Sequence, residues 1–383
     1  MDVIADSDVV VVGGGMAGIS AAIEAARGGV SVTLVTDGPL GRSNSIMAQG
    51  GIQLPKPEPE DSQLMIDDML AVGGGEVDEG RIRLFVGELP QLTTRLEEMG
   101  LTFDRDEEGG LMRRSAGGLS SPRIATVGDQ IGRPLMKLLK DRVSSECQVL
   151  TGTSVRAIEL DQKFEVVSSE GTLVCDSIVV ATGGVSYQEA LDTHELTSNP
   201  PNQNASLRSS LMALGLEETE PRRFQWHPFG IVASKRGITL SCVPESVAAL
   251  GPRLVTEEGA EVHTLPAPRS DVVASMRDAM DRGSTVHLTL TDLQENDLSR
   301  FPQVRTYMRD FGPESPLAPV LHYELSGFPT AVDQSSGVAG LYLAGEIVGG
   351  IHGRERLMGA GVADSLVHGR RAGESAASFV RGD

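Results

Sequence analysis

The sequence predicts an α/β fold in which one domain is interrupted by an inserted α+β module. Glycine supplies 45 of the 383 residues, or about 12% where about 7% is usual, and it follows no Gly-X-Y period, which indicates many tight turns. Apolar runs typical of buried strands lie near both ends of the chain, at residues 9–12 and 341–346. Prolines and charges between them predict domain segments at 1–228, 229–332 and 333–383, with the middle segment as the insertion.

The first element is a strand, followed by a glycine turn, a helix and a second strand. Residues 8–12 (DVVVV) predict a buried strand, residues 19–27 a helix of small residues, and residues 30–35 a second strand. A G-x-G-x-x-G pattern at the first turn of such a βαβ unit, within about 30 residues, is typical of dinucleotide binding. The candidate cofactor-binding residues of this turn are Gly13, Gly14, Gly15, Met16, Ala17 and Gly18.

Each glycine of the turn has a physical role in that interpretation. Gly13 permits the tight turn, Gly15 lets the backbone approach a pyrophosphate at the positive helix N-terminus, and Gly18 packs the helix against the strand. Dinucleotide folds usually end the second strand with an acid that binds a ribose hydroxyl, but here Thr36 holds that place and Asp37 follows it. This departure disfavours an NAD(P) dehydrogenase. A glycine-rich turn in a sheet that binds nothing stays open as an alternative.

Helical patterning dominates from residue 61 to residue 142, with breaks at residues 73–75 and at a polar loop over 104–118. After it, alternating and apolar runs predict a β-meander that leads into a strand ending in Ala-Thr-Gly-Gly. The remaining predicted elements, in order, are strands over residues 149–160, 164–167, 172–176 and 178–181, a strand over 341–346 and a closing helix over 362–377.

Composition and charge exclude several classes of function. With 33 basic and 53 acidic residues the net charge is −20, and a polyanion of this kind repels nucleic acid and anionic membrane surfaces. No apolar run approaches the roughly 18 residues of a membrane span. The first eight residues (MDVIADSD) are polar and acidic, the opposite of the basic start of a signal peptide, so we expect a cytoplasmic protein.

Cysteine usage agrees with that expectation. Cys147, Cys175 and Cys242 are far apart and form no C-x-x-C pair. We therefore expect no disulfide framework, no structural zinc or iron–sulfur site, and no metal.

Nine short stretches follow one another in a characteristic order. They are residues 42–52 (RSNSIMAQGGI), 103–106 (FDRD), 122–124 (PRI), 182–184 (TGG), 224–228 (FQWHP), 268–273 (PRSDVV), 322–323 (HY), 345–346 (GE) and 352–357 (HGRERL). In this order they resemble the flavoprotein family of succinate dehydrogenase, fumarate reductase and L-aspartate oxidase, without the family's C-terminal helical domain. The resemblance implies a Rossmann-like FAD-binding domain with a β-meander and an inserted α+β capping domain.

The resemblance also implies site residues. Arg269 matches the family's proton-transfer arginine and Glu245 its partner, which matters because an arginine alone is a poor base. His227, His322 and Arg356 match positions that bind the substrate carboxylates, for which imidazole and guanidinium donors are suited. Three of them have plainer interpretations: Arg269 as part of a surface ion pair, and the two histidines as structural hydrogen-bonding residues. The further cofactor-binding residues implied are Thr36, Ser43, Asn44, Ser45, Gln49, Gly50, Gly51, Val155, Ala181, Thr182, Gly183, Asn204, Glu346, Gly361 and Val362.

Several positions depart from the family pattern. Asn44 stands where several members attach FAD through a histidine, so we expect non-covalent FAD. Ala116 replaces a Glu or Phe, Leu119 a His or Gln, Pro244 a carboxylate-binding Thr and Ala248 a relay arginine, while Ala360 and Gly361 replace Asn-Ser. One carboxylate anchor is therefore intact and the second is weakened.

The predicted function is an FAD-dependent oxidoreductase that moves a hydride between flavin N5 and a carbon next to a carboxylate. Succinate, fumarate, aspartate or a modified, larger acid are the candidate substrates. Electrons would be exchanged with O₂, a quinone, fumarate or a partner protein. The alternative is a flavin-bearing electron-transfer or assembly subunit whose active site has degenerated.

Overall fold

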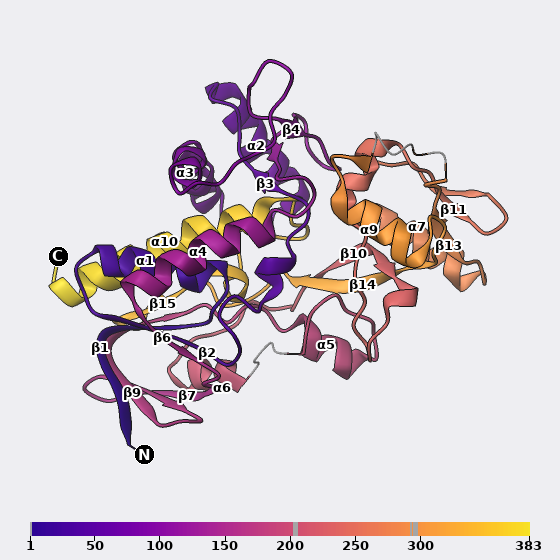
Figure 1. Ribbon diagram of the computed structural model, residues 1–383. Helices are drawn as coiled ribbons and strands as arrows, with labels where there is room; N and C mark the ends of the chain where they lie inside the picture. Colours follow the sequence, from indigo (N-terminus) through magenta and orange to yellow (C-terminus); the bar gives the residue numbers. More distant parts are fainter. Residues whose placement is uncertain (1, 202–205, 292, 294–297) are drawn as a thin grey trace.

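The computed structural model describes residues 2–201, 206–291, 293 and 298–383 of the chain. It consists of a larger layered α/β part, which carries both termini, and a smaller lobe that projects from one side of it (Figure 1). The predicted α/β class is confirmed.

The larger part is built on a seven-stranded sheet of order β6-β2-β1-β9-β8-β7, with β15 also pairing with β9. Strands β6, β2, β1, β9 and β15 run parallel to one another. Strands β9, β8 and β7 form an antiparallel meander. Their bounds are β1 (Val3–Val12), β2 (Val32–Thr36), β6 (Gln148–Thr151), β7 (Val155–Leu160), β8 (Phe164–Ser168), β9 (Thr172–Val180) and β15 (Leu341–Leu343).

The prediction of one strand over residues 149–160 is wrong. The backbone turns at Gly152, whose φ is +68°, in the left-handed region that favours glycine. The residues before this turn form β6, which pairs parallel with β2, and those after it form β7, the first strand of the meander. The apolar pattern continues through the turn, which is why it did not reveal the change of partner.

Helices cover one face of the sheet. The helices α1 (Met16–Arg27) and α10 (Ala360–Arg381) lie side by side on it, with α4 (Gly132–Glu146) next to them (Figure 1). Their close approach depends on small residues, because a Cβ added at Gly373 would lie 2.1 Å from the carbonyl oxygen of Ala21. The closing helix starts two residues earlier and ends four residues later than predicted, between Gly359 and Gly382.

A smaller group of elements lies beside these helices. It consists of α2 (Pro59–Gly73), α3 (Glu79–Glu98) and a three-stranded sheet of order β3-β5-β4, together with the short helix η1 that precedes it. The remaining bounds are η1 (Asn44–Met47), β3 (Ile52–Gln53), β4 (Arg113–Arg114) and β5 (Ile124–Ala125).

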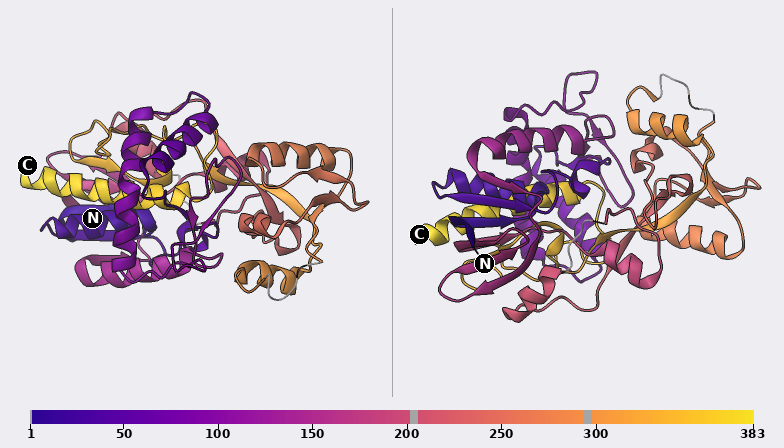
Figure 2. Two further views of the ribbon diagram at one scale, coloured as in Figure 1. Left: turned by 90° about the horizontal axis from the view of Figure 1, so that it is seen from above. Right: turned by 60° about the horizontal axis from the view of Figure 1, so that its bottom comes forward.

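The projecting lobe has its own five-stranded antiparallel sheet, of order β10-β14-β13-β11-β12, and its own buried apolar core (Figure 2). Helices α7 and α9 flank this sheet. The bounds are β10 (Phe224–Ile231), η2 (Val232–Ser234), η3 (Glu245–Leu250), β11 (Leu254–Thr256), β12 (Glu261–His263), α7 (Arg269–Asp281), β13 (Val286–Leu288), α9 (Pro302–Phe311) and β14 (Leu317–Glu324). The lobe is thus more regular than its proline-rich sequence indicated.

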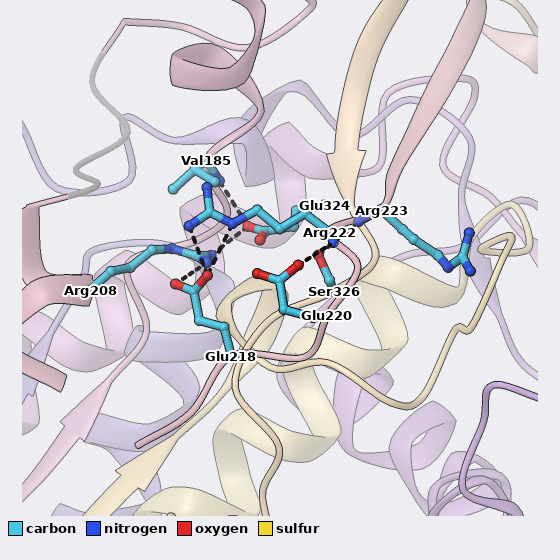
Figure 3. Close-up of polar contacts among 8 residues, drawn as sticks. All are labelled: Val185, Arg208, Glu218, Glu220, Arg222, Arg223, Glu324 and Ser326. Atoms are coloured by element: carbon cyan, nitrogen blue, oxygen red, sulfur yellow. Dashed lines mark hydrogen bonds and ion pairs between the residues drawn. The ribbon is translucent and has the colours of Figure 1, made fainter. Parts of the chain in front are cut away.

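Buried ion pairs tie the base of the lobe to the larger part (Figure 3). Arg208 of α6 (Ser206–Ala213) donates to Glu218 at 2.8 Å and to Glu324 at 2.5 Å, and these three side chains are exposed by only 8%, 6% and 0%. Glu324 also accepts from the backbone N–H of Val185, which precedes α5 (Ser186–Thr193). Glu218 precedes the lobe and Glu324 ends its last strand, so Arg208 holds together the two chain segments that connect the lobe to the larger part.

Two carboxylates of the larger part bind the starts of the lobe's helices. Asp129 accepts from the backbone N–H groups of Gln303 at 2.8 Å and Val304 at 3.0 Å in the first turn of α9. Glu355 accepts from the backbone N–H of Arg269 at 2.7 Å, at the start of α7. Carboxylates are favourable there because a helix N-terminus carries unpaired N–H groups and a partial positive charge.

Candidate active site

A cavity of about 830 Å³ lies where the carboxyl ends of β1 and β9 meet the lobe. Sheet edges of this kind are the usual ligand sites of α/β folds. The cavity is lined by all of the predicted site residues except two. Gly18 is not among its lining residues, and Asn204 lies outside the described residues. Residues from 13 to 362 in the sequence therefore converge on one cavity.

Gly18 serves packing instead. A Cβ at Gly18 would lie 1.9 Å from the carbonyl oxygen of Gly13, so only glycine lets α1 lie this close to the turn. Gly13 itself has φ of +123°, and a Cβ there would lie 2.2 Å from the carbonyl oxygen of Ala181. The glycines thus shape a bare backbone turn at the start of α1, whose N-cap residue Gly15 offers no side chain to its N–H groups.

Opposite the glycine turn, the cavity is lined by polar side chains from residues 43–51 and from the end of β2. The Ser45 hydroxyl accepts from the backbone N–H of Met16 at 3.1 Å, and a Cβ at Gly14 would lie 2.9 Å from the Thr36 hydroxyl. Among the described residues, the buried Ser43 Oγ and Asn44 Oδ1 have no hydrogen-bond partner. A helix N-terminus whose own N-cap residue has no side chain, together with buried polar atoms in need of partners, fits the pyrophosphate and polar ring edge of FAD.

The Asn44 amide is fixed by a network. Its Nδ2 donates to Asn199 Oδ1 at 2.5 Å, and Asn199 in turn donates to the carbonyl of His322 at 3.1 Å. Asn199 was missed by sequence analysis because it lies in none of the matched stretches.

Arg269 and Glu245 form a buried bidentate pair at the lobe side of the cavity. Arg269, the first residue of α7, donates through Nε to Glu245 Oε1 at 2.8 Å and through Nη2 to Glu245 Oε2. Burial alone would raise the pKa of Glu245, but the charges of Arg269 and His227 outweigh it and lower the pKa to about 2. Glu245 likewise raises the pKa of Arg269 against the effect of burial. The pair is therefore an ionised one at neutral pH.

Gln225 joins this pair to the second arginine of the site. Its side chain accepts from Arg269 Nη1 at 2.8 Å and donates to the backbone carbonyl of Arg356 at 2.9 Å. The sequence placed Gln225 within a matched stretch but gave it no role, since a single glutamine carries no spacing signal.

The two histidines lie together, with ring centroids 5.1 Å apart. The Nδ1 of His227 accepts from the backbone N–H of Phe229 at 3.1 Å, and the Nδ1 of His322 lies 2.7 Å from the Ser198 hydroxyl. Burial lowers the pKa of His227 to about 4, and burial together with repulsion from His227 and the arginines lowers the pKa of His322 well below its ordinary value. Both are neutral at pH 7, and His227 then carries its proton on Nε2.

Arg356 is buried and stacks over the ring of Tyr323, with 4.3 Å from its guanidinium carbon to the ring centroid. Burial, together with repulsion from Arg269, lowers its pKa to about 10, so it remains a cation at neutral pH. Its buried Nε has no partner among the described residues. A buried cation with an unused donor is suited to a carboxylate.

Two of the departures from the family pattern lie near this group. Ala116 and Ala248 line a second, smaller cavity of about 40 Å³ that also touches Glu245, Arg269 and Arg356. Pro244 directly precedes η3, and Ala360 begins α10.

Within the described residues, no cluster of His, Cys, Asp or Glu side chains has the arrangement of a metal site. Cys147, Cys175 and Cys242 are free thiols. No described helix combines the length and apolar character needed to cross a membrane.

Comparison with known proteins gives consistent results. A family described as "FAD binding domain" matches residues 8–362. The chain is 30% identical to an L-aspartate oxidase of Mycobacterium tuberculosis over 98% of this chain and 74% of that protein. It is 28% identical to a fumarate reductase (CoM/CoB) subunit of Methanothermobacter marburgensis, over 97% and 72%.

Solved structures show the same fold. A quinol fumarate reductase of E. coli superposes with a TM-score of 0.88 at 23% identity, covering all of this chain and 71% of that one. The Sdh1 complex of Mycobacterium smegmatis gives a TM-score of 0.80 at 26% identity, covering 99% and 69%.

Proposed function

Since the chain belongs to the FAD-binding family that includes L-aspartate oxidase and fumarate reductase, we propose that it oxidises or reduces a bond beside the carboxylate of a small acid. It is an FAD-dependent oxidoreductase of the succinate dehydrogenase, fumarate reductase and L-aspartate oxidase type. The finer proposal is carried by one observation: the Arg269–Glu245 pair, the two histidines and Arg356 line the same cavity as the glycine turn.

The residues of the larger part would hold FAD. The turn at Gly13–Gly15 would receive the pyrophosphate, while Ser43, Asn44 and Gly50 would border the flavin ring. Bound there, FAD supplies the two-electron chemistry of the reaction. The protein's contribution is to orient the acid, exclude water and move a proton.

Arg356 and His322 form the stronger carboxylate anchor. The Arg356 guanidinium is a buried cation, and a charge-assisted bidentate contact fixes orientation as well as affinity. His227 offers one neutral N–H donor and Pro244 no hydroxyl, so the opposite end of the substrate is held less firmly.

Arg269 is assigned to proton transfer at the carbon next to the one that exchanges electrons. Its ion pair with Glu245 orients the guanidinium, and Gln225 fixes the remaining nitrogen. We further propose that residues 229–332 act as a capping domain, which brings Arg269 over the cavity.

Turnover of a panel of acids with a dye acceptor tests this function. We expect at least one acid with a single well-placed carboxylate to bleach or restore the visible flavin band in the presence of the protein. A flavin-bearing protein that turns over no acid of the panel would instead favour the electron-transfer or assembly alternative.

L-Aspartate is expected to be a poor substrate within that panel. Ala116, which lines the small cavity beside Arg269 and Arg356, has no charge to bind the substrate ammonium. A missing charge-assisted contact is worth roughly 1.5–3 kcal/mol, or about ten- to a hundred-fold in kcat/KM. Aspartate with the highest kcat/KM of all the dicarboxylates tested would contradict this view of the pocket.

FAD is expected to be non-covalently bound. An asparagine amide at position 44 cannot form the bond to flavin that a histidine forms at this place in some relatives, so acid precipitation should release all the flavin into the supernatant. Yellow colour retained by the washed precipitate would refute non-covalent attachment, whatever the protein's substrate.

A further inference from the structure

The small cavity lies on the far side of the Arg269–Glu245 pair from the main cavity. Glu245, Arg269, Arg356 and Met358 line both cavities, so these side chains form the partition between them. The small cavity is also lined by Ala116, Ala248, Ala267 and Glu355. It therefore joins two carboxylates, one that is paired with Arg269 and one that lies nearer the surface.

The size of this cavity and its four charged lining residues suit water, while its other lining residues are apolar or glycine. Its volume of about 40 Å³ exceeds the roughly 10–15 Å³ of accessible space that one water needs, and Glu245 and Glu355 supply acceptors. Ala116 and Ala248 are among its lining residues, and longer side chains at these positions would reduce its volume.

Glu355 lies between this cavity and the surface. It is half-buried, accepts from the Arg269 backbone N–H at 2.7 Å and from the hydroxyl of exposed Ser270 at 2.6 Å. It touches neither the glycine turn nor the histidines in the main cavity, and in the sequence it occupies the unassigned position before Arg356.

We propose that water in the small cavity, held between Glu245 and Glu355, carries the proton that the reaction at Arg269 gains or loses. This proposal rests on the proposed function. When the acid is reduced, Arg269 gives a proton to the substrate carbon, and it recovers one through Glu245, which carries no proton at rest and must first receive one. Glu245 takes one from the cavity water, and the water takes one through Glu355 from the solvent. All residues end in their starting charge states, and one solvent proton is consumed; oxidation runs the same transfers in reverse.

Glu355 acts through Glu245 and is thus a positioning residue for the water path. Because the pKa of Glu245 is low, its carboxylate is protonated only briefly. The group that delivers the next proton to Glu245 therefore determines how fast Arg269 is protonated again. In this protein that group is water rather than a side chain.

The test uses the FAD-loaded protein and two variants that block the path in different ways. Glu355→Gln keeps an acceptor for the start of α7 but cannot exchange a proton, and Ala248→Leu fills the cavity without changing a polar group. We expect each to lower kcat about tenfold or more and to increase the solvent deuterium isotope effect on kcat. KM and flavin content should stay unchanged.

Asp129→Asn is the matched control, since Asp129 also binds a helix start of the lobe from the larger part but does not line the small cavity. We expect its kcat within roughly twofold of wild type and an unaltered isotope effect. A crystal structure at high resolution should show ordered water in the cavity of the wild type and none in Ala248→Leu.

Normal kcat and isotope effect in Glu355→Gln, or a dry cavity in the wild type, would overturn the proposal even if Ala248→Leu fails to fold. In that case wild-type turnover of an acid would leave the proposed function intact. Absence of any acid turnover by the wild type would overturn the function instead, and the water content of the cavity could still be determined.

Discussion

Replacing Arg269 with lysine is expected to lower kcat by about 10²–10⁴-fold while FAD stays bound. Lysine keeps the positive charge but lacks the planar fork through which Arg269 donates to both oxygens of Glu245 and to Gln225. The proton donor is then misplaced relative to the substrate carbon, and no connected partner restores its proton. Steady-state kinetics on the best acid of the panel measures the loss.

The control lies on the same helix. Arg277 of α7 stacks on the ring of Trp226 at 3.9 Å, and its side chain is 46% exposed. Arg277→Lys should leave kcat within roughly twofold, with flavin content and melting temperature followed in both variants. Near-normal turnover by Arg269→Lys would show that the proposed proton transfer does not take place through this residue.

Arg208→Met is expected to cost about 3–5 kcal/mol of the free energy of unfolding, the typical loss when one partner of a buried ion pair is removed. Arg208 is the cation shared by Glu218 and the fully buried Glu324 (Figure 3). Methionine preserves much of the volume but leaves these carboxylates without their charge partner. Denaturant unfolding at neutral pH measures the difference.

This loss should depend on pH in a defined direction. Burial already raises the pKa of Glu324 to about 7 in the folded protein, and removing Arg208 raises that pKa further. Stability linked to Glu324 is therefore present below its unfolded pKa and lost as the pH rises through the folded value, so the variant should lose more at about pH 8 than at about pH 5. A loss that grows toward acid pH would contradict the role assigned to Glu324.

Arg83→Met provides the comparison for an exposed pair. Arg83 and Glu79 lie one turn apart on α3, and their side chains are 49% and 55% exposed. Solvent-exposed pairs of this kind contribute about 0–1 kcal/mol. The contrast between the two arginines separates burial from the mere removal of a charge.

The fold was predictable where the sequence signal is local. The turn at Gly13–Gly18 sits within one strand and one helix, and its glycine spacing follows directly from the close approach of Gly18 to Gly13. The family could be identified because seven of its nine matched stretches contribute residues to the lining of the cavity, whereas residues 103–106 and 122–124 do not. By contrast, the change of strand partner at Gly152 depends on which edge of the sheet is free, and a run of apolar residues does not record that.

The candidate site was predictable as a set of residues but not as a set of contacts. His227 and Arg356 stood out because they occur in matched stretches. Gln225, Asn199 and Glu355 act through hydrogen bonds to residues far away in the chain, and no spacing rule reveals such partners. The small cavity is likewise defined by the absence of side-chain volume at Ala116 and Ala248, which only packing shows.

The hydrogen bonds that join the larger part to the N-termini of α7 and α9 have a consequence for product release. The contacts of Asp129 and Glu355 join carboxylates to backbone N–H groups, and water can replace both partners when they separate. The lobe keeps its own apolar core, so it can swing away from the larger part as a rigid body without unfolding. Opening the lobe therefore breaks only a few charge-assisted hydrogen bonds, which added salt weakens. This step is separate in energy from the stability of either part, and it does not have to limit the rate of turnover.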